Sequence, residues 1–236
     1  MTLDELVKQL RAAYGTALRS IVLYGSAAGG EAQAKKQDHN VLVIVDSLDA
    51  SRLRAASAAS RAWVDAGNHA PLTLTHDEWL GSADIFPMEY ADILERHRVL
   101  HGEPPFDGIR VDPKDLRLQL EQEAMGKLIR LRQGLLGAGN DPERELELLA
   151  TSLSQVLIVF RAFLRLHKAH PPKDNIELVE AVGQRAGFDA APFARVVRHI
   201  RSDPALRAAE AGEVLAGYLR GVERLVAYLD HFQPVG

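Results

Sequence analysis

Two apolar segments near the start of the chain constrain its fold more than any other feature. Residues 18–24 form a β-rich run that ends at Gly25, and residues 41–45 are five consecutive aliphatic residues, of which four are β-branched. Uninterrupted runs of this kind are typical of strands that are buried on both faces. The intervening residues 27–37 are rich in Gly, Ala and Lys without apolar periodicity, which predicts a mobile connection.

The rest of the first half predicts helices and at least one more strand. Apolar residues at helical spacing predict a helix over residues 3–13, and a second helix is predicted over residues 51–66. A strand is predicted at 71–75. Pro87 bars a helix interior and the pattern of residues 89–93 fits either a strand or a helix, so we predict a strand there and a helix over residues 94–100.

The second half is predicted to be a helical bundle. An Asp-Pro pair, which places an N-cap acceptor before proline at the first helical position, predicts three helix starts, at Asp112, Asp141 and Asp203. Apolar residues at alternating three- and four-residue steps predict one helix seam: Leu146, Leu149, Leu153, Val156, Phe160 and Phe163. Further helices are predicted over residues 176–186, 190–201 and 205–232. The break at 102–106 separates an α/β (α+β) domain with a small mixed sheet, residues 1–106, from a C-terminal helical bundle domain, residues 107–236.

Composition excludes several classes of function. The chain has 236 residues, of which 47% are hydrophobic, and no cysteine, so disulfides and thiolate chemistry are excluded. The net charge of -4 argues against nucleic acid as a partner. An acidic, amphipathic start and no apolar run near the roughly 20 residues that span a bilayer argue against a signal peptide and a membrane partner. We therefore expect a cytoplasmic protein.

The first strand and the start of the second carry residues suited to phosphate chemistry. Gly25 lets backbone N–H groups approach a phosphate, and the Ser26 hydroxyl adds a donor. Asp38 and Asn40 lie at i and i+2, which on a strand point to the same side. Mg²⁺ prefers oxygen ligands and takes one or two of them from protein. An ordinary turn and a loop carboxylate are the alternative interpretation of these residues.

The pattern Gly25-Ser26 followed by Asp38-His39-Asn40 resembles the nucleotidyltransferase superfamily, which includes aminoglycoside adenylyltransferases and kanamycin-type enzymes. That family carries Gly-Ser, then Asp-x-Asp, then a third acidic residue on a later strand. Asp38 matches the first aspartate, whereas Asn40 replaces the second. The resemblance covers residues 18–100, and the helical half is similar to the bundles that follow this domain in antibiotic-modifying members. The strand at 71–75 has no acid, so Glu89 is favoured over Asp92 as the third carboxylate.

The resemblance implies Mg²⁺-dependent transfer of a nucleoside monophosphate from a nucleoside triphosphate to a hydroxyl of a small molecule. Asp38 would be the principal Mg²⁺ ligand and Asn40 a neutral one, with Glu89 as ligand or general base. Gly25 and Ser26 would cradle the triphosphate, and Lys35 and Lys36 would meet its charge or remain solvated. Related enzymes often complete such a site with a second subunit, so the resemblance is compatible with a homodimer.

Two alternatives to this enzyme remain open. The chain is a catalytically silent homologue that regulates through nucleotide binding or a protein partner, as Asn40 suggests, or it is a helical interaction protein whose strand-turn-strand is coincidental. In the helical half, Arg161, Arg165 and Lys168 form a basic stripe, and Glu121 and Glu123 are candidate contacts for a cationic acceptor. Solvated helix surfaces explain both groups equally well. The histidines show no metal-ligand spacing.

Overall fold

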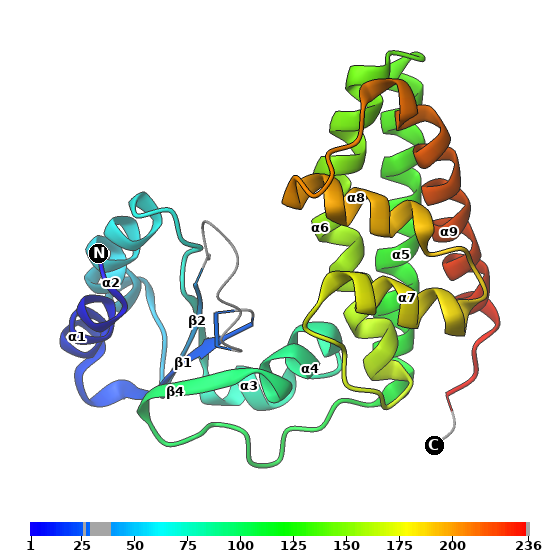
Figure 1. Ribbon diagram of the computed structural model, residues 1–236. Helices are drawn as coiled ribbons and strands as arrows, with labels where there is room; N and C mark the ends of the chain where they lie inside the picture. The colour runs from blue at the N-terminus through cyan, green and yellow to red at the C-terminus, as the bar shows by residue number, and fades with distance from the viewer. Residues whose placement is uncertain (26, 29–38, 235–236) are drawn as a thin grey trace. The chain divides into compact units, whose positions relative to one another are not determined.

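The computed structural model describes residues 1–25, 27–28 and 39–234. Ser26, Lys35, Lys36 and Asp38 therefore lie outside the described residues, as does most of the predicted connection. The chain divides into two compact units, Met1–Asp112 and Pro113–Gly236 (Figure 1). The division falls a few residues beyond the break at 102–106, because Phe106, Ile109 and Val111 pack against the sheet of the first unit.

The first unit is built on a mixed sheet of four strands. These are β1 (Leu18–Tyr24), β2 (Asn40–Val45), β3 (Leu72–Thr75) and β4 (His97–Gly102), in the order β3-β2-β1-β4. Strand β1 runs antiparallel to β2 and β4, and β2 runs parallel to β3. The two central strands are the two apolar runs of the sequence, and residues 41–45 of β2 are all buried, which confirms that both of its faces are covered.

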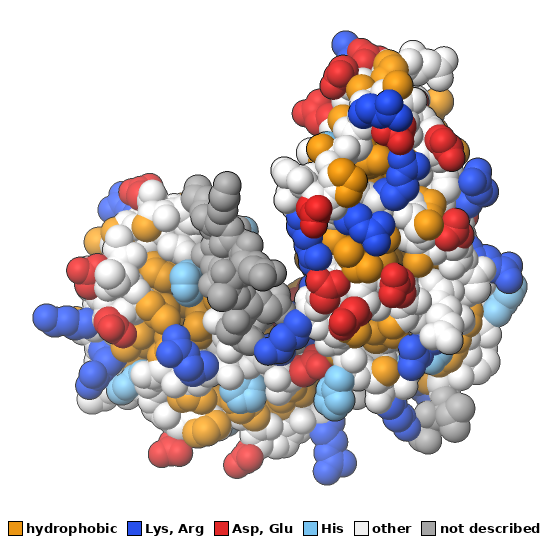
Figure 2. Space-filling model, in the orientation of Figure 1, with side chains coloured by type: hydrophobic (Ala, Val, Ile, Leu, Met, Phe, Trp, Pro, Cys, Tyr) orange, Lys and Arg blue, Asp and Glu red, His pale blue; other side chains and the backbone are white. Residues whose placement is uncertain are grey.

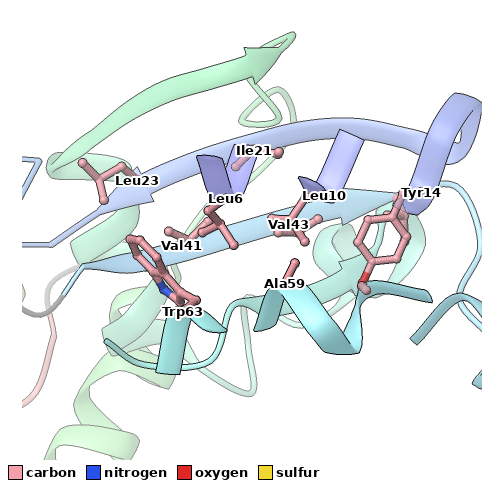
Figure 3. Close-up of a cluster of buried hydrophobic side chains, with 11 residues drawn as sticks. Leu6, Leu10, Tyr14, Ile21, Leu23, Val41, Val43, Ala59 and Trp63 are labelled. Atoms are coloured by element: carbon pink, nitrogen blue, oxygen red, sulfur yellow. The ribbon is translucent and has the colours of Figure 1, made fainter. Parts of the chain in front are cut away.

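Helices cover both faces of this sheet. On one face, α1 (Leu3–Tyr14) and α2 (Ala50–Asp65) bury Leu6, Leu10 and Trp63 against alternate residues of β1 and β2 (Figure 3). On the other face, α3 (His76–Gly81) and α4 (Pro87–Glu95) bring the rings of Trp79 and Tyr90 into a stack at 4.2 Å. Because side chains alternate along a strand, consecutive residues of β2 enter opposite cores.

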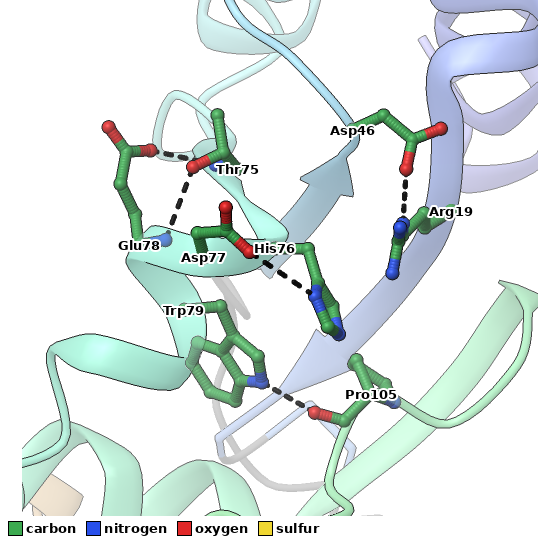
Figure 4. A network of polar contacts seen from close by, with 8 residues as sticks. All are labelled: Arg19, Asp46, Thr75, His76, Asp77, Glu78, Trp79 and Pro105. Carbon is green, nitrogen blue, oxygen red and sulfur yellow. Dashed lines mark hydrogen bonds and ion pairs between the residues drawn. The ribbon is translucent and has the colours of Figure 1, made fainter.

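The predicted strand at 89–93 and helix at 94–100 are both wrong. Residues 87–95 form α4, with Pro87 in its first turn, where proline is tolerated because no N–H is needed there. The strand follows instead as β4, at the edge of the sheet beside β1. The indole of Trp79 on α3 donates to the carbonyl of Pro105, and Thr75 and Glu78 form the capping box that starts α3 (Figure 4).

The second unit is a bundle of helices, as predicted. Its members are α5 (Pro113–Ala138), α6 (Pro142–Leu166), α7 (Asn175–Ala186), α8 (Ala191–Arg201) and α9 (Ala211–His231). Two of the three predicted Asp-Pro starts are confirmed by α5 and α6. The third is wrong, because Asp203 completes the end of α8: Ser202 adopts the left-handed conformation and the Asp203 N–H donates to the Arg198 carbonyl at 2.9 Å. Helix α9 begins after a short 3-10 turn, Ala208–Glu210.

Helix α6 is the central helix of the bundle. Five of the six predicted seam residues are buried, and α6 packs against α5, α7, α8 and α9. Among the described residues, it is the one helix long and apolar enough, by length and composition, to cross a membrane. The buried residues of α6 face the other helices of the bundle. A helix at the centre of a bundle is long and apolar for this reason.

His167, which follows α6, is packed among aromatic rings. Its ring lies 4.7 Å from the rings of both Phe163 and Phe232, and its Nε2 lies 3.2 Å from the Tyr228 hydroxyl. Burial, and secondarily the positive charge of Arg185, lower the pKa of His167 below its ordinary value of 6.5. The folded bundle therefore disfavours the protonated ring.

We expect the bundle to lose stability as the pH falls below 6.5. The folded pKa of His167 is depressed, so the unfolded chain takes up the proton first, and the contribution of the neutral ring is lost as the pH falls through the folded pKa. Denaturant unfolding followed by far-UV circular dichroism at pH 7.5 and 5.5 should show a larger loss for the wild type than for His167→Phe, which keeps a ring but cannot titrate. Equal losses would contradict this assignment.

Candidate nucleotide site

The candidate site begins at the turn that follows β1. Gly25 has a φ of +78°, a conformation that side chains with a Cβ rarely adopt. Its N–H donates to the carbonyl of Arg96 at 3.0 Å, and its own carbonyl accepts the Ala28 N–H at 3.1 Å. The Gly25 backbone is thus tied to the segment between α4 and β4 through the Arg96 carbonyl.

Asn40 and an acid from α4 meet at this turn. Asn40 is the first residue of β2 and lies opposite Tyr24, the last residue of β1. If Gly25 carried a Cβ, that atom would lie 3.3 Å from Nδ2 of Asn40 and 3.7 Å from Oδ2 of Asp92. Three elements therefore converge: the end of β1, the start of β2 and the middle of α4. An added Cβ would therefore press slightly on Asn40 and make ordinary van der Waals contact with Asp92, while the positive φ of Gly25 would strain any residue other than glycine.

Both candidates for the third carboxylate, Glu89 and Asp92, lie on helix α4, which corrects the predicted strand around Glu89. Asp92 lies at the Gly25 turn, and Glu89 lies one turn earlier on α4, exposed to solvent. Burial raises the pKa of the Tyr24 phenol, and the negative charges of Asp92 and then Glu89 raise it further. Both acids are therefore close enough to act on Tyr24. Strand β3, the neighbour of β2, carries no acid.

Asp92 is held by an arginine that the sequence analysis missed. Nη2 of Arg96 donates to Oδ1 of Asp92 at 2.6 Å, and both side chains are largely buried. The two residues are four apart on and just after α4, the spacing at which oppositely charged side chains meet on a helix. That spacing was the signal available in the sequence, and it was hidden by assigning this segment to a strand.

His39 lies on the other side of the sheet from Asn40. Its ring approaches that of Trp63 on α2, with centroids 5.8 Å apart, and its N–H donates to Asn68 at 3.2 Å. Alternation along β2 accounts for this difference, because residues 42 and 44 enter the core under α3 and α4 while residues 41, 43 and 45 enter the core under α1 and α2. His39 therefore packs on the face of the sheet that α2 covers.

Glu121, Glu123 and Arg161, three of the candidate residues of the helical half, have partners within that half. Glu121 pairs with Arg117 at 2.6 Å and Glu123 with Lys127 at 2.8 Å, each along one helix face. Arg161 donates to Asn175 at 2.7 Å and so joins α6 to the start of α7. Acidic and basic side chains are interspersed over the face of this unit seen in Figure 2. These pairs account for the charges as helix surface contacts.

Metal binding at the site depends on oxygen donors. Asn40 and Asp92 supply an amide and a carboxylate at the turn, donors of the kind that suit Mg²⁺. Within the described ranges, which leave out Asp38, no group of three or more histidines and acids is arranged to hold a metal. Asn40 and Asp92 therefore fit Mg²⁺ only in the kind of donor that they offer.

Comparison with known proteins supports the fold. No protein-family model matches the chain, and no curated protein matches it in sequence. Among solved structures, it is similar to spectinomycin adenyltransferase AAD(9) from Enterococcus faecialis, determined with ATP and spectinomycin. The match has 12% identity and a TM-score of 0.60, and it covers 97% of this chain and 98% of the other. The chain therefore has a nucleotidyltransferase-like α/β fold with a C-terminal helical region, as its Gly-Ser turn and apolar strands predicted.

Proposed function

We propose that the protein is a nucleotidyltransferase that moves a nucleoside monophosphate from a nucleoside triphosphate to a hydroxyl of a small molecule. The observation that carries this proposal is the convergence of Gly25, Asn40 and Asp92 at one end of the sheet. It occurs in a chain that matches an adenyltransferase along almost its entire length. The net charge of -4 favours a small acceptor over nucleic acid, and we place the protein in the cytoplasm.

Each residue has a distinct role in this proposal. The backbone at Gly25 and Ser26 cradles the triphosphate, while Lys35 and Lys36 offset its charge. Asp38 and Asn40 hold Mg²⁺, which when bound neutralises charge on the phosphates. Glu89, which we expected to be a ligand or general base, shares that assignment with Asp92, because Asp92 is the acid that reaches the Gly25 turn.

The reaction requires one bond to form and one to break at the α-phosphorus. The acceptor hydroxyl oxygen bonds to the α-phosphorus, the bond from that phosphorus to the bridging oxygen breaks, and pyrophosphate leaves with the electron pair. The hydroxyl proton passes to a carboxylate on α4. Positioning and electrostatic stabilisation supply most of the rate in phosphoryl transfer, so a fixed cradle and fixed oxygen donors suit this chemistry.

The test is transfer of label from α-labelled nucleoside triphosphates. The full chain is incubated with Mg²⁺, each of the four nucleotides and a panel of small hydroxyl acceptors that includes aminoglycosides. Labelled acceptor with an equal amount of pyrophosphate is expected, and chelation of Mg²⁺ should remove both. If calorimetry detects no nucleotide binding at any Mg²⁺ concentration, the proposal fails.

Asn40 favours a second candidate, a catalytically silent homologue that binds nucleotide and acts as a regulator. An amide brings no negative charge to offset metal ions, and β3 offers no replacement acid beside β2. In that case nucleotide would bind at the Gly25 turn without transfer. The two candidates differ in whether pyrophosphate is released, so the transfer assay separates them.

Replacing Asn40 with aspartate is expected to lower the Mg²⁺ concentration needed for half-maximal transfer by about tenfold, because an added carboxylate raises the charge of the ligand set. The new carboxylate would lie beside that of Asp92, and bound Mg²⁺ would offset the repulsion between the two carboxylates. The measurement is a Mg²⁺ titration of transfer, with Asn140→Asp, an exposed position between α5 and α6, as the matched control. An Asn40→Asp protein that binds nucleotide and still releases no pyrophosphate would favour the silent homologue.

A further inference from the structure

Helix α5 has a second apolar face that the bundle leaves uncovered. Its buried residues pack toward α6 and α9. A separate set of large apolar side chains on the same helix is exposed, at 63% for Leu118, 42% for Met125, 47% for Ile129 and 84% for Leu136. At 3.6 residues per turn these four lie within about 40° of one another around the helix. We call this set the α5 stripe.

The spacing between the residues of the α5 stripe is the same in both directions along the helix. Steps of seven, four and seven residues separate its members, so the order is symmetric about position 127. Such steps place all four at the a and d positions of a heptad, with Gln122 and Arg132 filling the two intervening positions. A helix with this pattern is complementary to an antiparallel copy of itself.

We propose that the α5 stripe is a homodimer interface in which α5 packs antiparallel against α5 of a second copy around a two-fold axis near position 127. In this register Leu118 meets Leu136 of the second copy, and Met125 meets Ile129. Two-fold interfaces use the same patch on both subunits, which this symmetry satisfies. The inference does not depend on the proposed transfer activity.

Charge favours the same register. Arg132 of one copy comes opposite Gln122 and beside Glu121 of the other, so a cation meets an acceptor and an acid. Arg132 donates one N–H to Glu223 of its own α9 at 2.8 Å, and a guanidinium has further donors for the second copy. A polar pair within an apolar seam fixes the register of paired helices.

The length of the stripe sets the expected affinity. From Leu118 to Leu136 it spans roughly 27 Å of helix, at about 1.5 Å per residue. One helix pair of this length buries less than the roughly 1,200 Å² of a stable interface. The dimer should therefore dissociate with a constant on the order of micromolar, and sedimentation velocity between about 1 and 100 µM should resolve both species.

Charge substitutions at Leu118 and Leu136, the two ends of the α5 stripe, test the antiparallel register. Leu118→Glu and Leu136→Lys should each give a monomer across that range, because each buries an unpaired charge against leucine. The double variant should regain the dimer, since each glutamate then meets a lysine of the second copy. Ile158→Lys, at an exposed apolar position of α6, is the control and should leave the dimer unchanged. A wild-type chain that is monomeric at 100 µM, or a double variant that stays monomeric, overturns the proposal.

Cysteine crosslinking gives an independent test in a chain that has no cysteine. Leu118→Cys and Leu136→Cys proteins, mixed and oxidised, should form a covalent dimer, and neither should do so alone. Both positions are exposed, so folding should survive the substitutions. Crosslinking of Leu118→Cys with itself would show a parallel pair and contradict the antiparallel register.

Discussion

Replacing Asp38 with alanine is expected to reduce transfer on the order of 1,000-fold. In the proposed reaction Asp38 is the charged ligand of the Asp38-His39-Asn40 segment, because Asn40 is neutral. Metal-assisted charge stabilisation contributes several kcal/mol to the barrier, and each 1.4 kcal/mol or so is tenfold in rate. The measurement is the initial rate of pyrophosphate release at saturating nucleotide, repeated over a range of Mg²⁺ concentrations.

Asp46→Ala is the matched control for this variant. Asp46 directly follows β2 at the opposite end of the strand, where it pairs with Arg19 on the surface (Figure 4). Removing an exposed pair of this kind changes stability by no more than about 1 kcal/mol, so transfer should be unchanged. Equal losses in the two variants would indicate general damage to the sheet, and a fully active Asp38→Ala protein would remove Asp38 from the chemistry.

The sheet centre and most helices could be predicted because burial leaves a strong pattern. Residues 41–45 are apolar without interruption because β2 is covered on both faces, and α6 shows its seam because it is the centre of the bundle. Strand β4 lies at the sheet edge with all six of its residues partly or fully exposed, so its sequence carries neither alternation nor an apolar run. Pro87 argues against a helix interior, yet proline is tolerated in the first turn of a helix, which is the place that it occupies in α4.

The places of two candidate site residues in the fold could be predicted for the same reason. Gly25 and Asn40 are local to the two apolar strands, and the structure brings both to one point. Asp92 reaches that point through the helical register of α4, which the strand assignment of this segment could not reproduce. A contact between residues 25 and 92 depends on how α4 packs on the sheet. The sequence indicates such a contact only when the segment is first recognised as a helix.

Replacing Gly102 with alanine is expected to destabilise the first unit by about 3 kcal/mol or more. Gly102 ends β4 with a φ of +79°, and an added Cβ would lie 1.8 Å from the carbonyl oxygen of Arg19 on β1. Because the obstructing atom belongs to the backbone, the two strands must separate. Gly108 is a matched control: its φ is +80° and nothing lies within 4 Å of its added Cβ, so Gly108→Ala should cost only about 1 kcal/mol of conformational strain.

Tryptophan fluorescence can follow this unit alone, because Trp63 and Trp79 are the only two tryptophans and both are buried in it. The difference of about 2 kcal/mol between Gly102→Ala and Gly108→Ala should separate their melting temperatures by roughly 10 °C. The carbonyl that holds the Gly25 turn belongs to Arg96, which directly precedes β4. A displaced β4 should therefore also weaken nucleotide binding at temperatures where the unit remains folded. Equal melting temperatures for the two variants would show that β1 and β4 adjust to the added methyl group without strain.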